Sequence, residues 1–540
     1  MNSAVSSRVP CDLDGYETPV HIVGRLHGSM TIELVWFKRD LRVHDHQALV
    51  DASNSEKDVV CIFLVEPERL AQPDCDPIHV EWELDCARAL ERELKVLGGS
   101  LDIRHEDALT ALEAIHSGHG ISTVRSHEEI GTEWSFERDK RVKTWCSENG
   151  VEWVEYPTNG VIRGLTDRDK WKYSRDRRMR LELLEPPEEL NGPVLGTEVP
   201  TLESLGIVSR GLVHRPEPGQ SAAWETLKSF LDERGEPYRW SMSGPSQAIV
   251  HCSRLSPYLS VGCISMRRVV QETSARMREL RELRSGGEEI GGWLKSLSSF
   301  QSRLAWHCHF MQKLENEPTL DNVAQNPLID RNLARELDGE RFAAWAEGRT
   351  GWPFFDACMR SLIATGWINF RMRAMLMSAA SYNLWLPWRD VGLHLARMFL
   401  DYEPGIHWSQ VGMQSGTTGI NSVRAYSVTK QGRDHDAEGD FIRSWVPELS
   451  EVPKEYIHEP WKMPEPLQGK LGCVIGSDYP FPIVDEASTR KEGVRMTYAA
   501  RRGEGTREAS KRVYEKHGSR RRPSRRRKRE KPDSKQTKLF

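Results

Sequence analysis

The segment LDYEPGIHWSQVGMQSG, residues 400–416, places two carboxylates and an imidazole around a Pro-Gly turn. Asp401 and Glu403 precede the turn, and His407 follows it. Further upstream, the arginine-rich stretch WINFRMR ends in Arg373. A buried arginine and a buried carboxylate are tolerable as a pair, and such a pair fixes the electric field around a bound group. A structural salt bridge at a helix end is the simpler alternative.

A second segment, SRLSPYLSVG from Ser253 to Gly262, combines hydroxyls with the start of a helix at Pro257. Hydroxyls and free backbone amides at a helix start form an anion site, so this segment could hold a phosphate or a pyrophosphate. Taken alone, the same residues favour a plain capping turn.

Tryptophans and histidines gather in the same half of the chain. Indole side chains usually fill a core, and periodicity cannot separate that role from a chain of redox-active aromatics. His307 and His309 form an HxH pattern on a predicted helix, where positions i and i+2 face apart, so we expect no shared metal. The tryptophans are Trp306, Trp345, Trp352, Trp367, Trp385, Trp388 and Trp408.

The elements that position these groups fall into two classes. Five short apolar patterns separated by helical patterns predict a doubly wound parallel sheet over residues 31–158. They are IELVWF, DVVCIFLVEP, LDIRHE, GISTVRSHEE and VEWVEYP. Sheets of this kind bind ligands beyond the carboxyl ends of their strands, but neither a GxGxxG nor a Walker sequence follows the first strand. We therefore disfavour an ordinary dinucleotide-binding domain there.

The rest of the chain is predicted to be helical or irregular. At 540 residues the chain is too long for one core. Residues 159–218 form a connector with a helical patch near KWKYSRDRRMRLELL, and residues 219–460 show helical periodicity and form an all-α domain. We expect residues 1–30 to be a disordered extension, residues 461–500 an irregular segment, and residues 501–540 a disordered basic tail.

The basic tail is electrostatically separate from the rest of the chain. Residues 511–531 hold twelve Lys/Arg against two Glu, whereas the net charge of the whole chain is −4. Such a cluster attracts DNA phosphates without regard to sequence, although a solvated tail with no partner is the alternative. The terminal QTKLF resembles peptides that dock on bacterial sliding clamps, with Gln536, Leu539 and Phe540 as the contacts.

Composition excludes several other classes of protein. The chain is 38% hydrophobic and 29% charged, without an apolar run long enough to span a membrane. Its ten cysteines form no CxxC pair, which argues against disulfides and structural zinc. We expect a monomer in a reducing cytoplasm, associated with the nucleoid if the source is bacterial.

Five motifs in chain order resemble the photolyase/cryptochrome family over about residues 31–460. They are LVWFKRDLRVHDHQAL, SRLSPYLSVG, EGRTGWPFFDACMRSLIATGWINFRMR, LDYEPGIHW and KQGRDHDAEGDFIRSWVPEL. The resemblance implies an N-terminal α/β domain that can hold an antenna chromophore of the folate or deazaflavin type. It also implies a helical domain that encloses FAD.

The resemblance also implies which residues contact the flavin. His307 stands where many members have a phosphate-facing arginine, and Cys252 where threonine is common. A positive charge facing the FAD phosphates therefore requires a protonated imidazole at His307, or compensation by Arg254 or Arg303. His407 takes the position that faces flavin N5, which would make the stabilised redox state depend on pH. The implied FAD contacts are Tyr238, Cys252, Ser253, Arg254, Leu255, Ser256, Arg303, His307, Arg373, Asp401, Glu403 and His407. The implied catalytic residues are His407, Arg373, Asp401 and Trp388.

The sequence departs from the family at two places. Of the residues that read a cyclobutane dimer, Trp306 is kept, whereas Arg303, Phe370 and Met413 replace the others. Phe370 and Ala374 also replace the two histidines of (6-4) repair. The candidate DNA-lesion pocket is Trp306, Phe370, Arg371 and Met413.

The second departure concerns the usual relay of three tryptophans, of which Trp388 alone remains. Val411 and Arg335 take the other two places, so electron transfer must use Trp385, Trp408 or Tyr402. The branch of the family with an iron–sulfur cluster is excluded, because no cysteine lies between Cys358 and Cys473.

These observations support a light-driven DNA photolyase that splits pyrimidine dimers by electron transfer from reduced flavin. A cryptochrome-type photoreceptor without repair activity is the main alternative. A helical DNA-binding module with a vestigial flavin site is the third.

Overall fold

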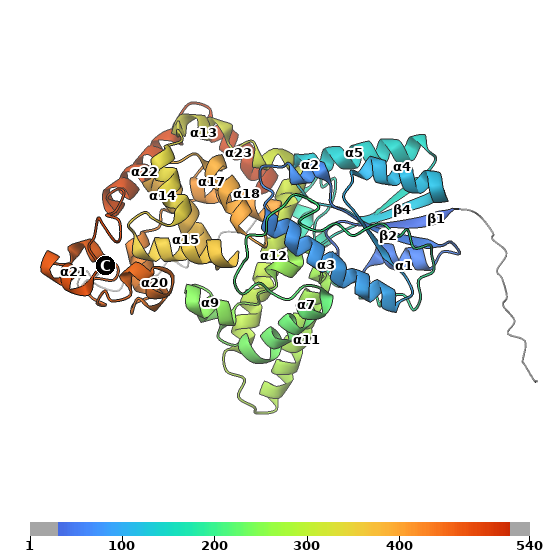
Figure 1. Ribbon diagram of the computed structural model, residues 1–540, viewed down its shortest axis with the longest axis horizontal. Coiled ribbons are helices and arrows are strands. Elements are labelled where there is room, and N and C mark those ends of the chain that lie inside the picture. The colour runs from blue at the N-terminus through green and yellow to red at the C-terminus, as the bar shows by residue number, and fades with distance from the viewer. Residues whose placement is uncertain (1–30, 519–540) are drawn as a thin grey trace, which may run out of the picture.

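The computed structural model describes residues 31–518, and its N-terminal part is a five-stranded parallel sheet (Figure 1). The strand order is β3-β2-β1-β4-β5, so the order reverses between β1 and β4. The predicted doubly wound sheet is confirmed. The strands are β1 (Ile32–Phe37), β2 (Val59–Leu64), β3 (Leu101–Arg104), β4 (Ile121–His127) and β5 (Glu152–Tyr156).

Helices cover both faces of this sheet, which explains why all six residues of β1 are buried. One face packs against α1 (Gln47–Ser53) and α3 (Pro77–Val96), and its core continues into the helical half of the molecule. The other face packs against α4 (Ala108–His119) and α5 (Glu133–Glu148). A single turn of helix, α2 (Pro67–Leu70), follows β2 and leads into α3.

The connector lies over the α/β domain as an extended chain. Its predicted helical patch is confirmed as α6 (Trp171–Arg178). Beyond it, the backbone N–H of Val59 donates to the carbonyl of Asn191 at 2.7 Å. Gly192 lies so close that a Cβ atom would meet the Val59 carbonyl oxygen at 2.2 Å. The connector is therefore held at the start of β2, an inner strand of the sheet.

The second half is helical, as predicted, and the long helix α12 runs through the middle of the molecule (Figure 1). Its helices begin with α7 (Gln220–Ser229), α8 (Tyr238–Ser241), α9 (Pro245–His251), α10 (Ser256–Val261), α11 (Met266–Ser285) and α12 (Trp293–Asn316). They continue with α13 (Pro327–Leu333), α14 (Gly339–Glu347), α15 (Pro353–Thr365), α16 (Phe370–Ser378), α17 (Trp388–Met398), α18 (Pro404–Ser415), α19 (Val428–His435) and α20 (Asp440–Trp445).

The C-terminal region corrects two expectations. Residues 461–500 are not irregular throughout, and residues 501–518 are not a disordered tail, because they contain α21 (Glu465–Leu471), α22 (Glu486–Ala500) and α23 (Thr506–His517). The buried faces of α22 and α23 consist mainly of small residues, so their apolar periodicity is weak. Gly493 makes this packing close, since a Cβ atom there would meet the Tyr382 carbonyl at 2.1 Å.

Three predictions fall wholly or mostly outside the described residues: the N-terminal extension, the DNA-attracting basic cluster, and the clamp-binding contacts Gln536, Leu539 and Phe540. Within residues 31–518, no helix is both long enough and apolar enough to cross a membrane. The nine cysteines of this range are all free thiols.

Candidate functional site

The predicted ion pair between Arg373 and Asp401 is confirmed. Arg373 on α16 donates from Nη1 and Nη2 to the two oxygens of Asp401 at 2.9 and 2.8 Å. Its Nε donates to the Ile368 carbonyl at 2.7 Å, which fixes the plane of the guanidinium. Burial raises the pKa of Asp401, but Arg373 outweighs this effect and holds the pKa below its usual value. Asp401 is therefore a fixed negative charge in the interior.

A second charged pair lies nearby and involves His307, the residue for which the resemblance implies a phosphate-facing arginine in many relatives. The His307 Nε2 atom on α12 lies 2.7 Å from a carboxylate oxygen of Glu403. Burial lowers the pKa of His307, but the Glu403 carboxylate reverses this effect and raises the pKa to about 10. The imidazole is thus a cation at neutral pH. Its Nδ1 is buried and makes no hydrogen bond of good geometry to residues 31–518.

The SRLSPYLSVG loop meets the Arg373–Asp401 pair. The side chain of Ser256 hydrogen-bonds Asp401, which helps to keep its pKa low. Arg254 adopts a left-handed backbone conformation with φ of 61° and lies over the Trp367 ring at 3.8 Å. Burial lowers the pKa of Arg254 to about 10, so this guanidinium also stays charged at pH 7.

The charges of this region do not balance. Three cations, Arg254, Arg373 and protonated His307, face two carboxylates, Asp401 and Glu403. These three side chains are partly buried, and an excess of positive charge shielded from water is costly unless an anionic group compensates for it. The donor set therefore fits a diphosphate or another anionic part of a ligand.

Other predicted contacts surround the same loop. Tyr238 is buried against Phe230 and Phe300, with ring centroids 5.5 and 6.0 Å away. Burial raises the pKa of Cys252 to about 12, so its side chain is a neutral thiol. The loop backbone is fixed by Arg234, which donates to the Ser253 carbonyl at 2.7 Å. Leu255 is buried at the start of α10.

His407 is neutral rather than poised to titrate near pH 7. Burial lowers its pKa to about 4, and its Nε2 donates to the Gly392 carbonyl at 2.8 Å. The lone pair then resides on Nδ1, which can accept a hydrogen bond. The pH dependence that the resemblance implies for the redox state stays a prediction, and a pKa of about 4 places it in acid rather than near pH 7.

The lesion-pocket prediction divides into two parts. Trp306 and Phe370 are 41% and 49% exposed, and the Arg303 guanidinium lies 5.2 and 5.9 Å from their ring centroids. These three side chains form an open aromatic and cationic cluster. Arg371 has a buried Nε without a hydrogen bond to the described residues, and Met413 is half-buried in α18. Arg371 directly follows Phe370 in α16.

The relay candidates also separate. Trp388 and Trp408 lie edge to face with centroids 5.9 Å apart, and His407 contacts Trp408 at 5.0 Å. Trp385 packs instead in a small cluster with α13 and α22, and the Arg335 guanidinium lies 4.6 Å from its ring. A cation at this distance disfavours an indole radical cation. The prediction of Trp385 as a relay member is therefore not supported, whereas Trp388 and Trp408 are brought together.

Two features were missed by sequence reasoning. Asp74 accepts a hydrogen bond from Tyr402 across the interface between the two halves. Asp40, His46 and His127 form a buried cluster at the carboxyl ends of β1 and β4. The signal for the second lay in KRDLRVHDH, which follows the first strand.

The Asp40 cluster is a hydrogen-bonded group rather than a set of metal ligands. His46 Nε2 and His127 Nδ1 each lie 2.8 Å from the same oxygen of Asp40. Leu49 donates its backbone N–H to His46 Nδ1, so the proton of this ring is on Nε2 and points at Asp40. That nitrogen has no lone pair to offer an ion.

Comparisons with known proteins agree with this geometry. Residues 33–166 match the family model described as DNA photolyase, and residues 300–499 match the model described as the FAD binding domain of DNA photolyase. Cryptochrome-2 of Arabidopsis thaliana is 30% identical over 85% of this chain and 77% of its own length. A deoxyribodipyrimidine photo-lyase of Vibrio cholerae is 28% identical over 87% of this chain and 100% of its own length.

Solved structures share the fold. A bacterial class III photolyase from Agrobacterium tumefaciens superposes with a TM-score of 0.78, covering 89% of this chain and 100% of its own, at 24% identity. Relatives named for repair and relatives named as cryptochromes thus match to similar extents.

Proposed function

Because the chain belongs to the photolyase/cryptochrome family, we propose that it binds FAD in its helical half and uses blue light to split pyrimidine dimers in DNA. When bound, the flavin supplies the light-driven one-electron chemistry. The protein supplies position, charge and a pocket that excludes water. The excess of partly buried positive charge around the Ser253–Ser256 loop is the observation that supports flavin binding most strongly.

Each side chain of the site has a distinct part in this proposal. His307 and Arg254 supply positive charge for the anionic diphosphate, in the manner that buried cations and helix starts usually do. The Arg373–Asp401 pair holds a fixed dipole against the ring system. His407, neutral at pH 7, offers Nδ1 as an acceptor and no proton.

The cluster of Trp306, Arg303 and Phe370 supports a DNA substrate. A flipped dinucleotide presents flat bases and a phosphate, which aromatic faces and a guanidinium can hold together. The cluster is open to solvent, as a substrate site requires. The basic C-terminal residues would add salt-dependent attraction for DNA phosphates, and Gln536, Leu539 and Phe540 would dock on a sliding clamp. We further propose a cytoplasmic monomer.

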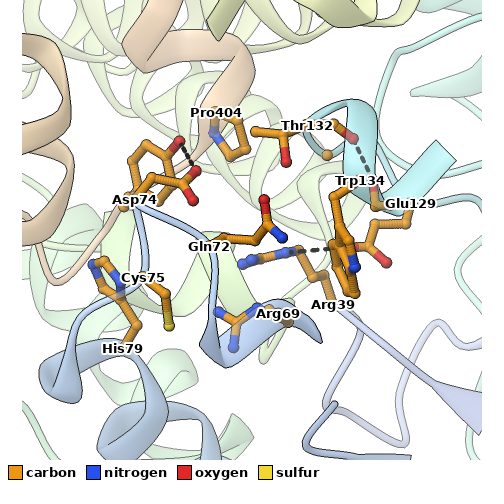
Figure 2. A pocket seen from close by; sticks show the side chains of 13 residues that line it. Arg39, Arg69, Gln72, Asp74, Cys75, His79, Glu129, Thr132, Trp134 and Pro404 are labelled. Atoms are coloured by element: carbon orange, nitrogen blue, oxygen red, sulfur yellow. Dashed lines mark hydrogen bonds and ion pairs between the residues drawn. The ribbon is translucent and has the colours of Figure 1, made fainter. Parts of the chain in front are cut away.

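An antenna chromophore of the folate or deazaflavin type would need its own cavity. The cavity between the α/β domain and α18 is lined by Arg39, Trp134 and Tyr402, among others (Figure 2). The volume of this cavity is about 30 Å³, which is room for roughly two water molecules. A folate does not fit this space, so an antenna pigment would have to bind elsewhere or widen the cavity.

A photoreceptor without repair activity is the second candidate. Arg303 and Phe370 stand where dimer-repairing relatives have a carboxylate and an amide, and this loss favours sensing. The deciding experiment illuminates the purified, chemically reduced protein with UV-irradiated thymine oligonucleotides and measures the restored bases. Repair above a dark control supports the photolyase. Flavin photoreduction without repair supports the photoreceptor, and a colourless protein without flavin refutes both.

A further inference from the structure

Tyr402 occupies an unusual position where the two halves of the molecule meet. Its hydroxyl donates to an oxygen of Asp74 at 2.6 Å and accepts from the indole N–H of Trp408 at 3.0 Å. Asp74 belongs to the turn between α2 and α3, whereas Tyr402 and Trp408 belong to the helical half. Burial, reinforced by the charge of Asp74, raises the pKa of Tyr402 well above its usual value. The resting phenol therefore keeps its proton.

The far side of Asp74 borders the small cavity between the domains. Figure 2 shows Asp74 and Gln72 around this cavity, together with Arg39 and Arg69. Both guanidiniums have carboxylate partners: Arg69 pairs with Glu83 at 2.6 Å, and Arg39 pairs with Glu129 at 3.5 Å. The cavity is thus not an anion site. It has room for water beside Asp74, so a proton on this carboxyl group has a place to go.

Tyr402 also touches the aromatic side chains that run into the helical core. Its ring centroid lies 5.3 Å from that of His407, which in turn lies 5.0 Å from Trp408. The next indole, Trp388, lies 5.9 Å from Trp408. These contacts are close enough for an electron to move between neighbouring rings without a gap in the packing.

Another buried tyrosine shows what Tyr402 has that an ordinary core tyrosine lacks. The Tyr382 hydroxyl is buried and makes no hydrogen bond to residues 31–518, and the Arg335 guanidinium lies 5.9 Å from its ring. Oxidation of a phenol requires loss of its proton, because the phenol radical cation is a strong acid. Tyr382 has no carboxylate to take that proton, whereas Tyr402 does.

We propose that Tyr402 is a proton-coupled electron donor to Trp408, with Asp74 as the proton acceptor. When Trp408 has lost one electron, Tyr402 passes it an electron, and the phenolic O–H bond breaks as the proton moves to the Asp74 carboxylate. Trp408 returns to a neutral indole, Tyr402 becomes a neutral phenoxyl radical, and Asp74 becomes a carboxylic acid. The oxidant of Trp408 is the photoexcited flavin, so this inference rests on the proposed function.

The test compares radicals formed under blue light in the full-length, flavin-containing protein. Transient absorption and electron paramagnetic resonance distinguish a phenoxyl radical from an indole radical. We expect the unchanged protein and the Tyr382→Phe control to form the phenoxyl signal, and the Tyr402→Phe variant to stop at the indole signal. Asp74→Asn keeps a side chain of the same size but is a poor base, so it should slow phenoxyl formation by on the order of tenfold or more.

The possible outcomes distinguish a failure of the inference about Tyr402 from a failure of the proposed function. A phenoxyl signal that persists in Tyr402→Phe, a signal lost in Tyr382→Phe, or an unchanged rate in Asp74→Asn would overturn the inference. An unchanged protein that shows an indole radical alone would do the same. If the purified protein contains no flavin, the proposed function itself fails. Flavin absorbance and the tryptophan fluorescence of each variant report whether it has folded.

Discussion

Replacing Glu403 with glutamine should remove the charge of His307 and with it much of the stability of the helical half. The two side chains are 10% and 8% exposed and lie 2.7 Å apart, so their interaction is barely screened by water. The substituted amide would keep the size of the side chain and a hydrogen-bond acceptor, but no negative charge. Burial would then lower the pKa of His307, opposed by the neighbouring Cys308 without the stronger effect of the Glu403 charge.

The magnitude follows from the two pKa values of His307. The pKa is raised from 6.5 in the unfolded chain to about 10 in the fold. The folded state therefore binds more protons than the unfolded state between these values, and stability from this group is lost as the pH rises toward 10. Linkage gives a contribution of about 4 kcal/mol at pH 7 and about 1.4 kcal/mol at pH 9. The pH 7 value agrees with the roughly 3–5 kcal/mol lost when one partner of a buried pair is removed.

Urea unfolding followed by tryptophan fluorescence measures this difference directly. The free-energy gap between the unchanged protein and Glu403→Gln should be large at pH 7 and small at pH 9. Glu317→Gln is a matched control, since Glu317 lies 2.5 Å from Nε2 of buried His517. Burial lowers the pKa of His517, so the loss in this control should be the same at both pH values. A gap for Glu403→Gln that does not shrink at pH 9 would refute the assignment of a protonated His307.

The same approach gives two further predictions. Arg373→Ala leaves Asp401 buried without its partner and should lower the free energy of unfolding by about 3–5 kcal/mol. Arg373→Lys keeps the positive charge without the paired hydrogen bonds and should lower the free energy of unfolding by less. The urea midpoint of each variant measures these losses, and equal losses would contradict a bidentate role of Arg373. Gly493→Ala places a methyl group against the Tyr382 carbonyl and should detach α22, which limited proteolysis detects as earlier cleavage in residues 486–517. Gly469→Ala in α21 is its control, because a Cβ atom there meets nothing within 4 Å, and equal proteolysis of the two variants would be evidence against close packing of α22.

The fold was accessible from the sequence wherever burial repeats with a regular period. Both faces of the sheet are covered, so a strand such as IELVWF is apolar at nearly every position and cannot be mistaken for an exposed one. The C-terminal helices gave no such signal. The buried positions of α22 are Gly493, Thr497 and Ala500, which carry little apolar surface. Their contribution comes from close backbone approach, which hydrophobic periodicity does not report.

The site was predictable as a set of residues but not as a set of charges. The Arg373–Asp401 pair was implied by the resemblance to the photolyase/cryptochrome family, and it agrees with the rule that neither group is stable alone in a core. The protonation of His307 depends on Glu403, a residue far along the chain, and on the depth at which both are buried. His407 shows the opposite result from the same ring, because its partner is a carbonyl rather than a carboxylate.

The assignment of electron-transfer residues also required the fold. Sequence alone offered Trp385, Trp408 and Tyr402 on equal terms. A positive φ of 57° at Trp385 turns this residue toward the cluster of α13 and α22, beneath the cation of Arg335. Tyr402 gains its carboxylate from a loop of the other domain. Neither a backbone turn nor a contact between domains leaves a local pattern in the chain.

The two histidines and the tyrosine of this region together show how charge is distributed across the site. His307 is kept positive by a carboxylate on the side where an anionic ligand would bind. His407 is kept neutral among aromatic rings, so no fixed positive charge on this imidazole opposes the formation of an electron hole on Trp408. Tyr402 has its proton acceptor, Asp74, at the cavity between the domains. Under the proposed function, the same side-chain types attract an anion at one end and permit loss of an electron at the other, because carboxylates hydrogen-bond His307 and Tyr402, whereas a backbone carbonyl hydrogen-bonds His407.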